Sequence, residues 1–140
     1  MREITFTEAA REALAEAMRL DPTIFVLGEG IGARGGNYNT TVGLYDLYGT
    51  ERLRDTPICE RGFTNLATGA ALAGGRPVVD FMVIDFELDA FGDLVNQASK
   101  MRWMSGGRLK VPLLVRGAIG VLSSAAAHHS GNYYSFFMHQ

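Results

Sequence analysis

Cysteine is nearly absent from this chain, since Cys59 is the only one among 140 residues. A single thiol excludes a disulfide within the chain and a zinc site made of cysteines alone, and this usage is typical of a reducing compartment. We therefore expect a cytoplasmic protein. A catalytic role for Cys59 is the less favoured interpretation, because the residue ends a segment that looks like an apolar strand.

The chain also lacks an excess of charge and any long apolar run. Its formal net charge is −2, with acidic and basic residues interspersed. No basic surface for a phosphate backbone is expected, so nucleic acid is not an expected partner. No apolar run reaches the roughly 18 residues of a membrane span, and Met1–Leu20 is regularly charged, unlike a secretory signal. We expect no membrane association.

What the chain does contain is an alternation of helix and strand patterns. Thr5 and Glu8 have capping-box spacing, and one apolar helix face continues to about Leu20. The patterns predict strands at 23–27, 77–83 and 111–115, and helices at about 44–48, after Glu60 and from 91 to an end at 105–107. Near-continuous apolar strands alternating with helices predict one α/β domain with a mainly parallel sheet, covered by helices on both faces.

Ligands of such sheets bind at the carboxyl ends of the strands, which directs attention to Glu29, Glu60, Phe86 and His129. Pro57 keeps the chain before Glu60 extended, and a helix rich in Gly and Ala follows it. Two interpretations of Glu60 stay open on spacing alone. The helix dipole favours an acid near a helix N-terminus, or the carboxylate points at a ligand.

A glycine motif directly after the first strand requires a separate decision. Gly30-Ile31-Gly32-Ala33-Arg34-Gly35 satisfies the G-x-G-x-x-G pattern, and Asp55 follows about 20 residues later. A dinucleotide site needs this loop to open a helix, yet the following residues, 36–41, are polar and carry no apolar period. We expect a glycine loop near a site or a subunit contact instead of nicotinamide or flavin binding.

Several short segments occur in an order and spacing that match a known family. They are Gly28-Glu29-Gly30-Ile31-Gly32, Gly35-Gly36-Asn37-Tyr38, Thr41-Val42-Gly43-Leu44, the run from Asp55 to Phe63, Gly74 to Val78, Asp85 to Asp93, Asn96 to Gly107, Val111-Pro112, Arg116-Gly117 and His129-Ser130. Together they resemble the beta subunit of the decarboxylase component of thiamine diphosphate-dependent 2-oxo acid dehydrogenases. The resemblance covers essentially the whole chain and implies a transketolase-like pyrimidine-binding domain.

The resemblance also implies a role for each matched residue. Glu60 would hydrogen-bond a ring nitrogen of the cofactor's aminopyrimidine and relay a proton, for which it should lie out of water. Phe86 would pack against the pyrimidine, with Ile58 and Met82 completing an apolar wall. Without the resemblance, these three would be ordinary core residues.

Two further residues receive roles from the resemblance. Glu29 matches an acid that in some relatives belongs to a proton relay between paired active sites, although a solvated loop acid is the plain alternative. His129 matches the histidine that faces the substrate and assists acyl transfer to a lipoyl group. The neighbouring His128 adds no metal site, because the pair lacks both the spacing and the acidic companions of one.

The resemblance further implies that this chain holds only part of an enzyme. No Gly-Asp-Gly segment followed by Asn, which holds magnesium and diphosphate in such enzymes, is present. That half of the cofactor site would lie on an alpha subunit, with a lipoyl acyltransferase as a second partner. The substrate would be pyruvate, a branched-chain 2-oxo acid or acetoin, and the isolated chain is expected to be inactive.

The end of the chain is apolar and carries no formal charge. From Gly117 to Gln140 there is no Asp, Glu, Lys or Arg, and aromatic residues gather near Gln140. We expect residues 1–140 to form one domain that lacks its last elements and the C-terminal domain of the family, and to self-associate through exposed apolar surface. The alternative function is a non-catalytic relative that keeps the fold and acts only as an oligomerising or binding module.

Overall fold

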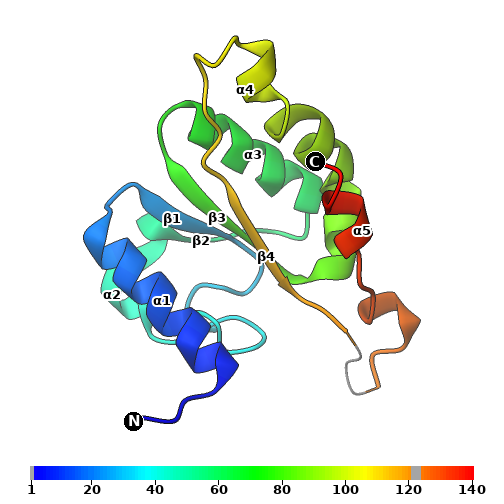
Figure 1. The fold of residues 1–140 in the computed structure, drawn as a ribbon. Coiled ribbons are helices and arrows are strands. Elements are labelled where there is room, and N and C mark those ends of the chain that lie inside the picture. The colour runs from blue at the N-terminus through cyan, green and yellow to red at the C-terminus, as the bar shows by residue number, and fades with distance from the viewer. Residues whose placement is uncertain (1, 121–123) are drawn as a thin grey trace.

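A four-stranded parallel sheet forms the centre of the fold in the computed structural model, which describes residues 2–120 and 124–140 (Figure 1). The strand order is β2-β1-β3-β4, with every neighbouring pair parallel. The strands are β1 (Ile24–Gly28), β2 (Leu53–Asp55), β3 (Arg76–Val83) and β4 (Leu114–Ala118). The predicted α/β class with a parallel sheet is confirmed.

Helices cover both faces of this sheet. The longer ones are α1 (Phe6–Leu20), α2 (Leu44–Arg52) and α3 (Glu60–Leu72). Shorter helical segments are η1 (Ile84–Ala90), η2 (Asp93–Ala98), α4 (Met101–Met104), η3 (Ala127–His129) and α5 (Tyr134–Phe137). Figure 1 shows α1 and α2 together on one side of the sheet, with α3 and α4 on the other.

Adjacent residues of a strand contribute to two different core clusters, one on each face of the sheet. Val26 and Val78 pack with Leu14 and Met18 of α1 in one cluster, and their neighbours in the chain pack with α3 in a second cluster. Successive side chains of a strand point to opposite faces, so a strand that is covered on both sides needs apolar residues at every position. This explains the near-continuous apolar runs in the sequence.

The start of α1 follows the predicted capping box. The Thr5 hydroxyl accepts the backbone N–H of Glu8, and the Glu8 carboxylate accepts the backbone N–H of Thr5 at 2.7 Å. These contacts satisfy two amide groups that the first helical turn leaves without partners. Helix α3 begins at Glu60, as the sequence predicts, but its N-cap Cys59 makes no side-chain capping bond.

Several boundaries differ from the prediction, including the end of the helix expected at 44–48, which continues to Arg52. The single helix expected from 91 to 105–107 ends there, since Ser105 is the C-cap of α4, but it is interrupted. The Ser99 amide donates to Leu94 O and the Ser99 hydroxyl donates to Val95 O, at the wider π-helical turn of η2. The strand expected at 111–115 begins at Leu114 instead, since Pro112 has no N–H for the ladder. Cys59 is exposed beyond the end of β2 and does not end an apolar strand.

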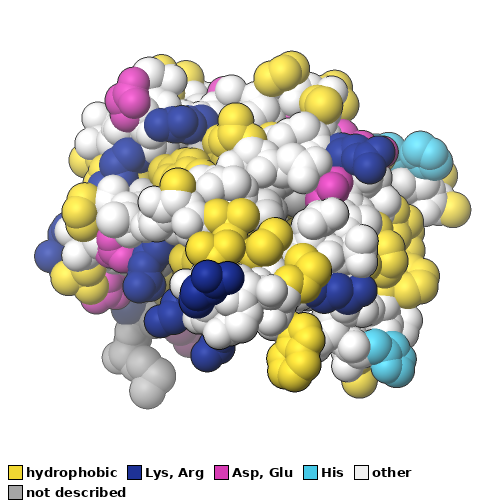
Figure 2. Space-filling model, turned by 90° about the horizontal axis from the view of Figure 1, so that it is seen from above, with side chains coloured by type: hydrophobic (Ala, Val, Ile, Leu, Met, Phe, Trp, Pro, Cys, Tyr) yellow, Lys and Arg dark blue, Asp and Glu magenta, His cyan; other side chains and the backbone are white. Residues whose placement is uncertain are grey.

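Strand β4 forms one edge of the described sheet, and apolar side chains remain exposed over the molecule. Figure 2 shows such side chains lying between Lys and Arg on the face seen from above. Within residues 2–120 and 124–140, no helix combines the length and the apolar character needed to span a bilayer.

Candidate functional site

The residues that the sequence singled out follow the carboxyl ends of different strands. Glu29 comes directly after β1, Glu60 opens α3 after β2, and Phe86 lies in η1 after β3. His129 lies in η3, which follows β4 along the chain. In a parallel sheet these ends share one edge, which is where open α/β sheets bind their ligands.

Glu29 and Glu60 form a pair of neighbouring carboxyl groups. Both side chains are half-buried. Burial raises the pKa of Glu29, and the charge of Glu60 together with a side-chain hydrogen bond to it raises the pKa further, with a smaller effect from Asp55. Glu60 thus occupies the first turn of α3, where the dipole favours an acid, and also faces a specific partner.

Phe86 and His129 lie together in the structure. Their ring centroids are 5.2 Å apart with an interplanar angle of 80°, and both residues are half-buried. The adjacent His128 is exposed and lies farther away, at 6.4 Å between centroids. In the described part of the chain, no three His, Cys, Asp or Glu residues are arranged to hold a metal ion.

Ile58 and Met82 occupy different surroundings. Ile58 is 81% exposed, so this chain by itself does not place its side chain in an apolar wall. Met82 is half-buried at the end of β3 and has a φ of +63°, which non-glycine residues rarely adopt. This conformation coincides with a register shift between Asp80 and Val83 in the β3–β4 ladder. Such a bulge re-aims side chains beside a site.

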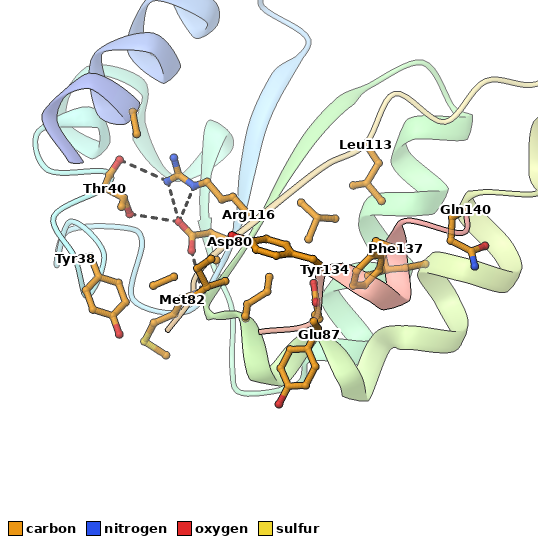
Figure 3. Close-up of a pocket in the computed structure, with 18 of the residues that line it drawn as sticks. Tyr38, Thr40, Asp80, Met82, Glu87, Leu113, Arg116, Tyr134, Phe137 and Gln140 are labelled. Atoms are coloured by element: carbon orange, nitrogen blue, oxygen red, sulfur yellow. Dashed lines mark hydrogen bonds and ion pairs between the residues drawn. The ribbon is translucent and has the colours of Figure 1, made fainter. Parts of the chain in front are cut away.

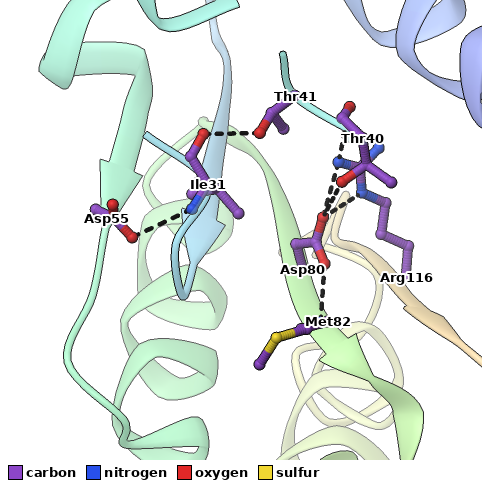
Figure 4. A network of polar contacts seen from close by, with 7 residues as sticks. All are labelled: Ile31, Thr40, Thr41, Asp55, Asp80, Met82 and Arg116. Atoms are coloured by element: carbon purple, nitrogen blue, oxygen red, sulfur yellow. Dashed lines mark hydrogen bonds and ion pairs between the residues drawn. The ribbon is translucent and has the colours of Figure 1, made fainter. Parts of the chain in front are cut away.

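The glycine loop is held by a strand residue and opens no helix. The Asp55 carboxylate accepts the backbone N–H groups of Ile31 and Gly32 at 3.2 and 3.3 Å, and Thr41 donates its hydroxyl to Ile31 O at 2.7 Å (Figure 4). Residues 29–43 form turns and irregular structure. The structural context of a dinucleotide fingerprint is therefore missing, as the sequence indicated, and Asp55 acts as a loop anchor.

An ion pair between β3 and β4 was not predicted. The Asp80 carboxylate accepts Arg116 Nε at 2.9 Å and Nη2 at 2.8 Å, and the two side chains are 7% and 21% exposed. Thr40 donates its hydroxyl to the same carboxylate, and the Met82 N–H donates to its other oxygen at 2.9 Å (Figure 4). One carboxylate thus fastens the glycine loop, the bulge of β3 and strand β4.

A signal for this pair exists in the sequence, because Asp80 and Arg116 interrupt two apolar runs. Recognising it requires the strand order and register, which place the two residues directly opposite each other. Gly28 is also part of this arrangement, since a Cβ there would collide with the carbonyl oxygen of Asp80.

Two further acids, Asp85 and Glu87, are buried in η1 and were not singled out by the sequence. Asp85 accepts hydrogen bonds from the Gly131 amide and the Tyr133 hydroxyl. Glu87 is 4% exposed, and burial, followed by the charge of Asp85, raises its pKa to about 7. Near neutral pH, Glu87 is therefore only partly ionised.

A groove of about 980 Å³ runs beside β4. Figure 3 shows it extending from the Asp80–Arg116 pair to Phe137 of α5, with Glu87 at its side. Met82 lines the groove, whereas Glu60 and His129 do not. The groove is thus mainly the uncovered flank of an edge strand, and the acid pair and the Phe86–His129 contact lie apart from it.

Comparison of the sequence with known proteins identifies the family that this chain matches. The profile of the transketolase pyrimidine-binding domain matches residues 2–140. Pyruvate dehydrogenase E1 component subunit beta of Rickettsia conorii is 46% identical over 137 residues, and the corresponding beta-2 mitochondrial subunit of Oryza sativa subsp. japonica is 44% identical over 138. These alignments cover 98% and 99% of this chain but 42% and 37% of the relatives, so the chain spans less than half of their length.

Proposed function

The chain belongs to the transketolase pyrimidine-binding domain family, and from this we infer that it supplies the pyrimidine half of a composite thiamine diphosphate site. The enzyme would be a 2-oxo acid dehydrogenase complex. The names of the relatives favour pyruvate over a branched-chain 2-oxo acid or acetoin. The observation that carries the proposal is the Glu29–Glu60 carboxyl pair at the carboxyl ends of the strands.

The residues present suit the pyrimidine part of this cofactor. Burial and the nearby charge of Glu60 raise the pKa of Glu29, which favours its protonated form. Glu60 would hydrogen-bond a ring nitrogen of the pyrimidine. Phe86 is half-buried and offers an apolar ring for the pyrimidine, and its contact with His129 gives the imidazole a defined place.

The chemistry divides between the cofactor and the protein. When bound, thiamine diphosphate supplies a nucleophilic carbon and an electron sink for decarboxylation of a 2-oxo acid. Glu60 orients the pyrimidine and moves a proton at its ring nitrogen, while Glu29 stores a proton next to Glu60. His129 faces the substrate and donates or accepts a proton during acyl transfer to lipoamide.

Several partners complete this proposal. An alpha subunit supplies the groups for magnesium and diphosphate, a lipoyl acyltransferase receives the acyl group, and copies of the chain associate with one another. The exposed Ile58 lies immediately before α3, where a partner subunit can cover it and complete the apolar wall. A cytoplasmic location belongs to the same proposal.

Glu60→Gln provides the main test. The chain, an alpha subunit from a close relative, magnesium and thiamine diphosphate are combined, and pyruvate-dependent dye reduction is measured. The variant should lose at least about 100-fold in rate, because it removes a group that transfers a proton in the reaction. Glu16→Gln changes an exposed acid of α1 and serves as the matched control. Wild-type turnover in Glu60→Gln would remove Glu60 from the assigned role.

A second arm tests the alternative of a non-catalytic module. The chain is joined to the remaining sequence of the Rickettsia conorii relative, with which 98% of it aligns. Activity of this longer protein supports the enzymatic proposal even when the chain alone is inactive. A well-folded longer protein that associates with the alpha subunit but shows no turnover favours the binding module.

A further inference from the structure

Asp85 joins two segments that are distant in sequence. It lies in η1 just after β3, and its carboxylate accepts the Gly131 N–H at 3.0 Å to Oδ1 and 3.2 Å to Oδ2. The same Oδ1 accepts the Tyr133 hydroxyl at 3.1 Å. Gly131 and Tyr133 directly follow η3, the short helical turn that carries His129.

These contacts are the main polar attachment of the His129 segment, residues 124–133. In the part of the chain that the structure describes, Asp85 is the one side chain outside the segment that hydrogen-bonds to it. Gly120 adds a backbone bond to Gly131 O at 3.3 Å, while Ser130 and His129 bond back to Ala126 inside the segment. Figure 1 shows η3, in orange, projecting beyond the carboxyl end of β4.

The position of Asp85 in the chain couples this attachment to the site. Its neighbour Phe86 contacts the His129 ring at 5.2 Å between centroids. Two adjacent residues of η1 thus contact the segment: Asp85 accepts hydrogen bonds from it, and Phe86 makes an edge-to-face aromatic contact with it. Loss of the hydrogen bonds would leave the ring contact as the main side-chain attachment of His129 to η1.

We propose that Asp85 is a positioning residue that holds residues 124–133 against η1 and thereby keeps the His129 imidazole on Phe86. The importance of His129 for acyl transfer rests on the proposed function, but the positioning itself does not. A carboxylate suits this task, because carboxylate oxygens are stronger hydrogen-bond acceptors than neutral amide oxygens. Burial and the bond to Asp85 raise the pKa of Tyr133, so its hydroxyl remains a donor.

Three variants separate positioning from folding. Asp85→Ala removes the acceptor, and Asp85→Asn keeps one oxygen in place. Asp89→Ala removes an exposed acid of the same short helix and is the matched control. Isotope-labelled full chain is studied by NMR without cofactor. In Asp85→Ala the His129 ring protons should lose the shift caused by Phe86, and Gly131 amide exchange should accelerate at least about tenfold, as expected for a lost charge-assisted bond. Asp85→Asn should restore most of both signals, and Asp89→Ala should match wild type.

Unchanged His129 shifts and Gly131 exchange in folded Asp85→Ala would overturn the proposal. If Asp85→Ala fails to fold, Tyr133→Phe decides. This change removes one donor, and the His129 shifts should then move partway toward those of an unstructured histidine. Wild-type His129 shifts in folded Tyr133→Phe would then overturn the proposal.

An assay with the alpha subunit distinguishes this proposal from the function on which its significance rests. Asp85→Ala should lower the rate of acyl transfer to lipoamide, with cofactor affinity unchanged within about twofold, since it leaves Glu60 and Phe86 in place. Absence of activity in the wild-type assembly would count against the proposed function alone. The NMR measurements would still decide whether Asp85 positions His129.

Discussion

Replacing Asp80 by alanine should destabilise the domain more than any surface substitution. The change removes the acceptor of two Arg116 contacts at 2.8 and 2.9 Å and of the Met82 N–H at 2.9 Å. The guanidinium, 21% exposed, would then keep a weak contact to the Thr40 carbonyl at 3.5 Å. The largely buried guanidinium charge of Arg116 is then left almost without a partner.

The magnitude follows from these contacts. Removing one partner of a buried ion pair costs about 3–5 kcal/mol, and the partial exposure of Arg116 places this case near the lower end. The orphaned Met82 amide adds about 1 kcal/mol. We therefore expect a loss of about 4 kcal/mol, a large part of the roughly 5–15 kcal/mol that stabilises a typical domain.

Equilibrium urea unfolding followed by circular dichroism measures this loss. Asp89→Ala, an exposed acid, is the control and should change the free energy of unfolding by less than about 0.5 kcal/mol. Arg116→Met and the double variant complete a thermodynamic cycle, in which the double variant should be more stable than the sum of the single losses predicts. A loss below about 1 kcal/mol in Asp80→Ala, or a coupling energy near zero, would refute the reasoning.

Three further predictions concern Met82, Glu87 and Glu29. Because Met82 has a φ of +63°, Met82→Gly should be about 1 kcal/mol more stable than Met82→Ala in urea unfolding, and equal stability would contradict the strain. The pKa of Glu87 is raised from 4.5 to about 7, so between these pH values the folded state keeps a proton that the unfolded state releases. The free energy of unfolding should therefore fall by about 1–3 kcal/mol as pH rises from about 4.5 to 7 and slightly above. This fall should be absent in Glu87→Gln. A titration in which Glu87→Gln retains the full fall would assign it to another group. In a carboxyl-carbon NMR titration, Glu60→Gln should lower the pKa of Glu29 but leave the part of the increase that burial causes, and an unchanged pKa would show that the two groups do not interact.

The sequence predicted the helices and strands of this fold well, because they follow from local capping contacts and from periodic patterns of apolar residues. The capping box of Thr5 and Glu8 fixes the start of α1, and strands buried on two faces need apolar runs. The interrupted helix after Phe91 was missed because Ser99 competes for backbone groups in a way that apolar spacing does not record. Pro112, in contrast, carried a readable signal against a strand at 111–115.

The candidate site was predictable to a different degree for each residue. The strand-end rule directed attention to Glu29 and Glu60, which follow β1 and β2 and influence each other, and their role stays a prediction. Asp80, Asp85 and Glu87 were missed because their partners lie far along the chain or, for Glu87, because burial itself is the perturbation. Such contacts depend on the strand register and on loops that fold back onto the sheet, and neither can be determined from a single sequence.

Five acids at the carboxyl end of the sheet fall into two groups according to what donates to them. Asp55, Asp80 and Asp85 each accept backbone N–H groups and hold a loop, a bulge or the His129 segment. In the described ranges 2–120 and 124–140, no backbone amide or basic side chain donates to Glu29 or Glu60, which face each other instead. Donors commit the three aspartates to structure, whereas burial and the nearby charge of Glu60 raise the pKa of Glu29. This difference supports the proposal that the two glutamates carry the chemistry while the aspartates keep the loops in place around them.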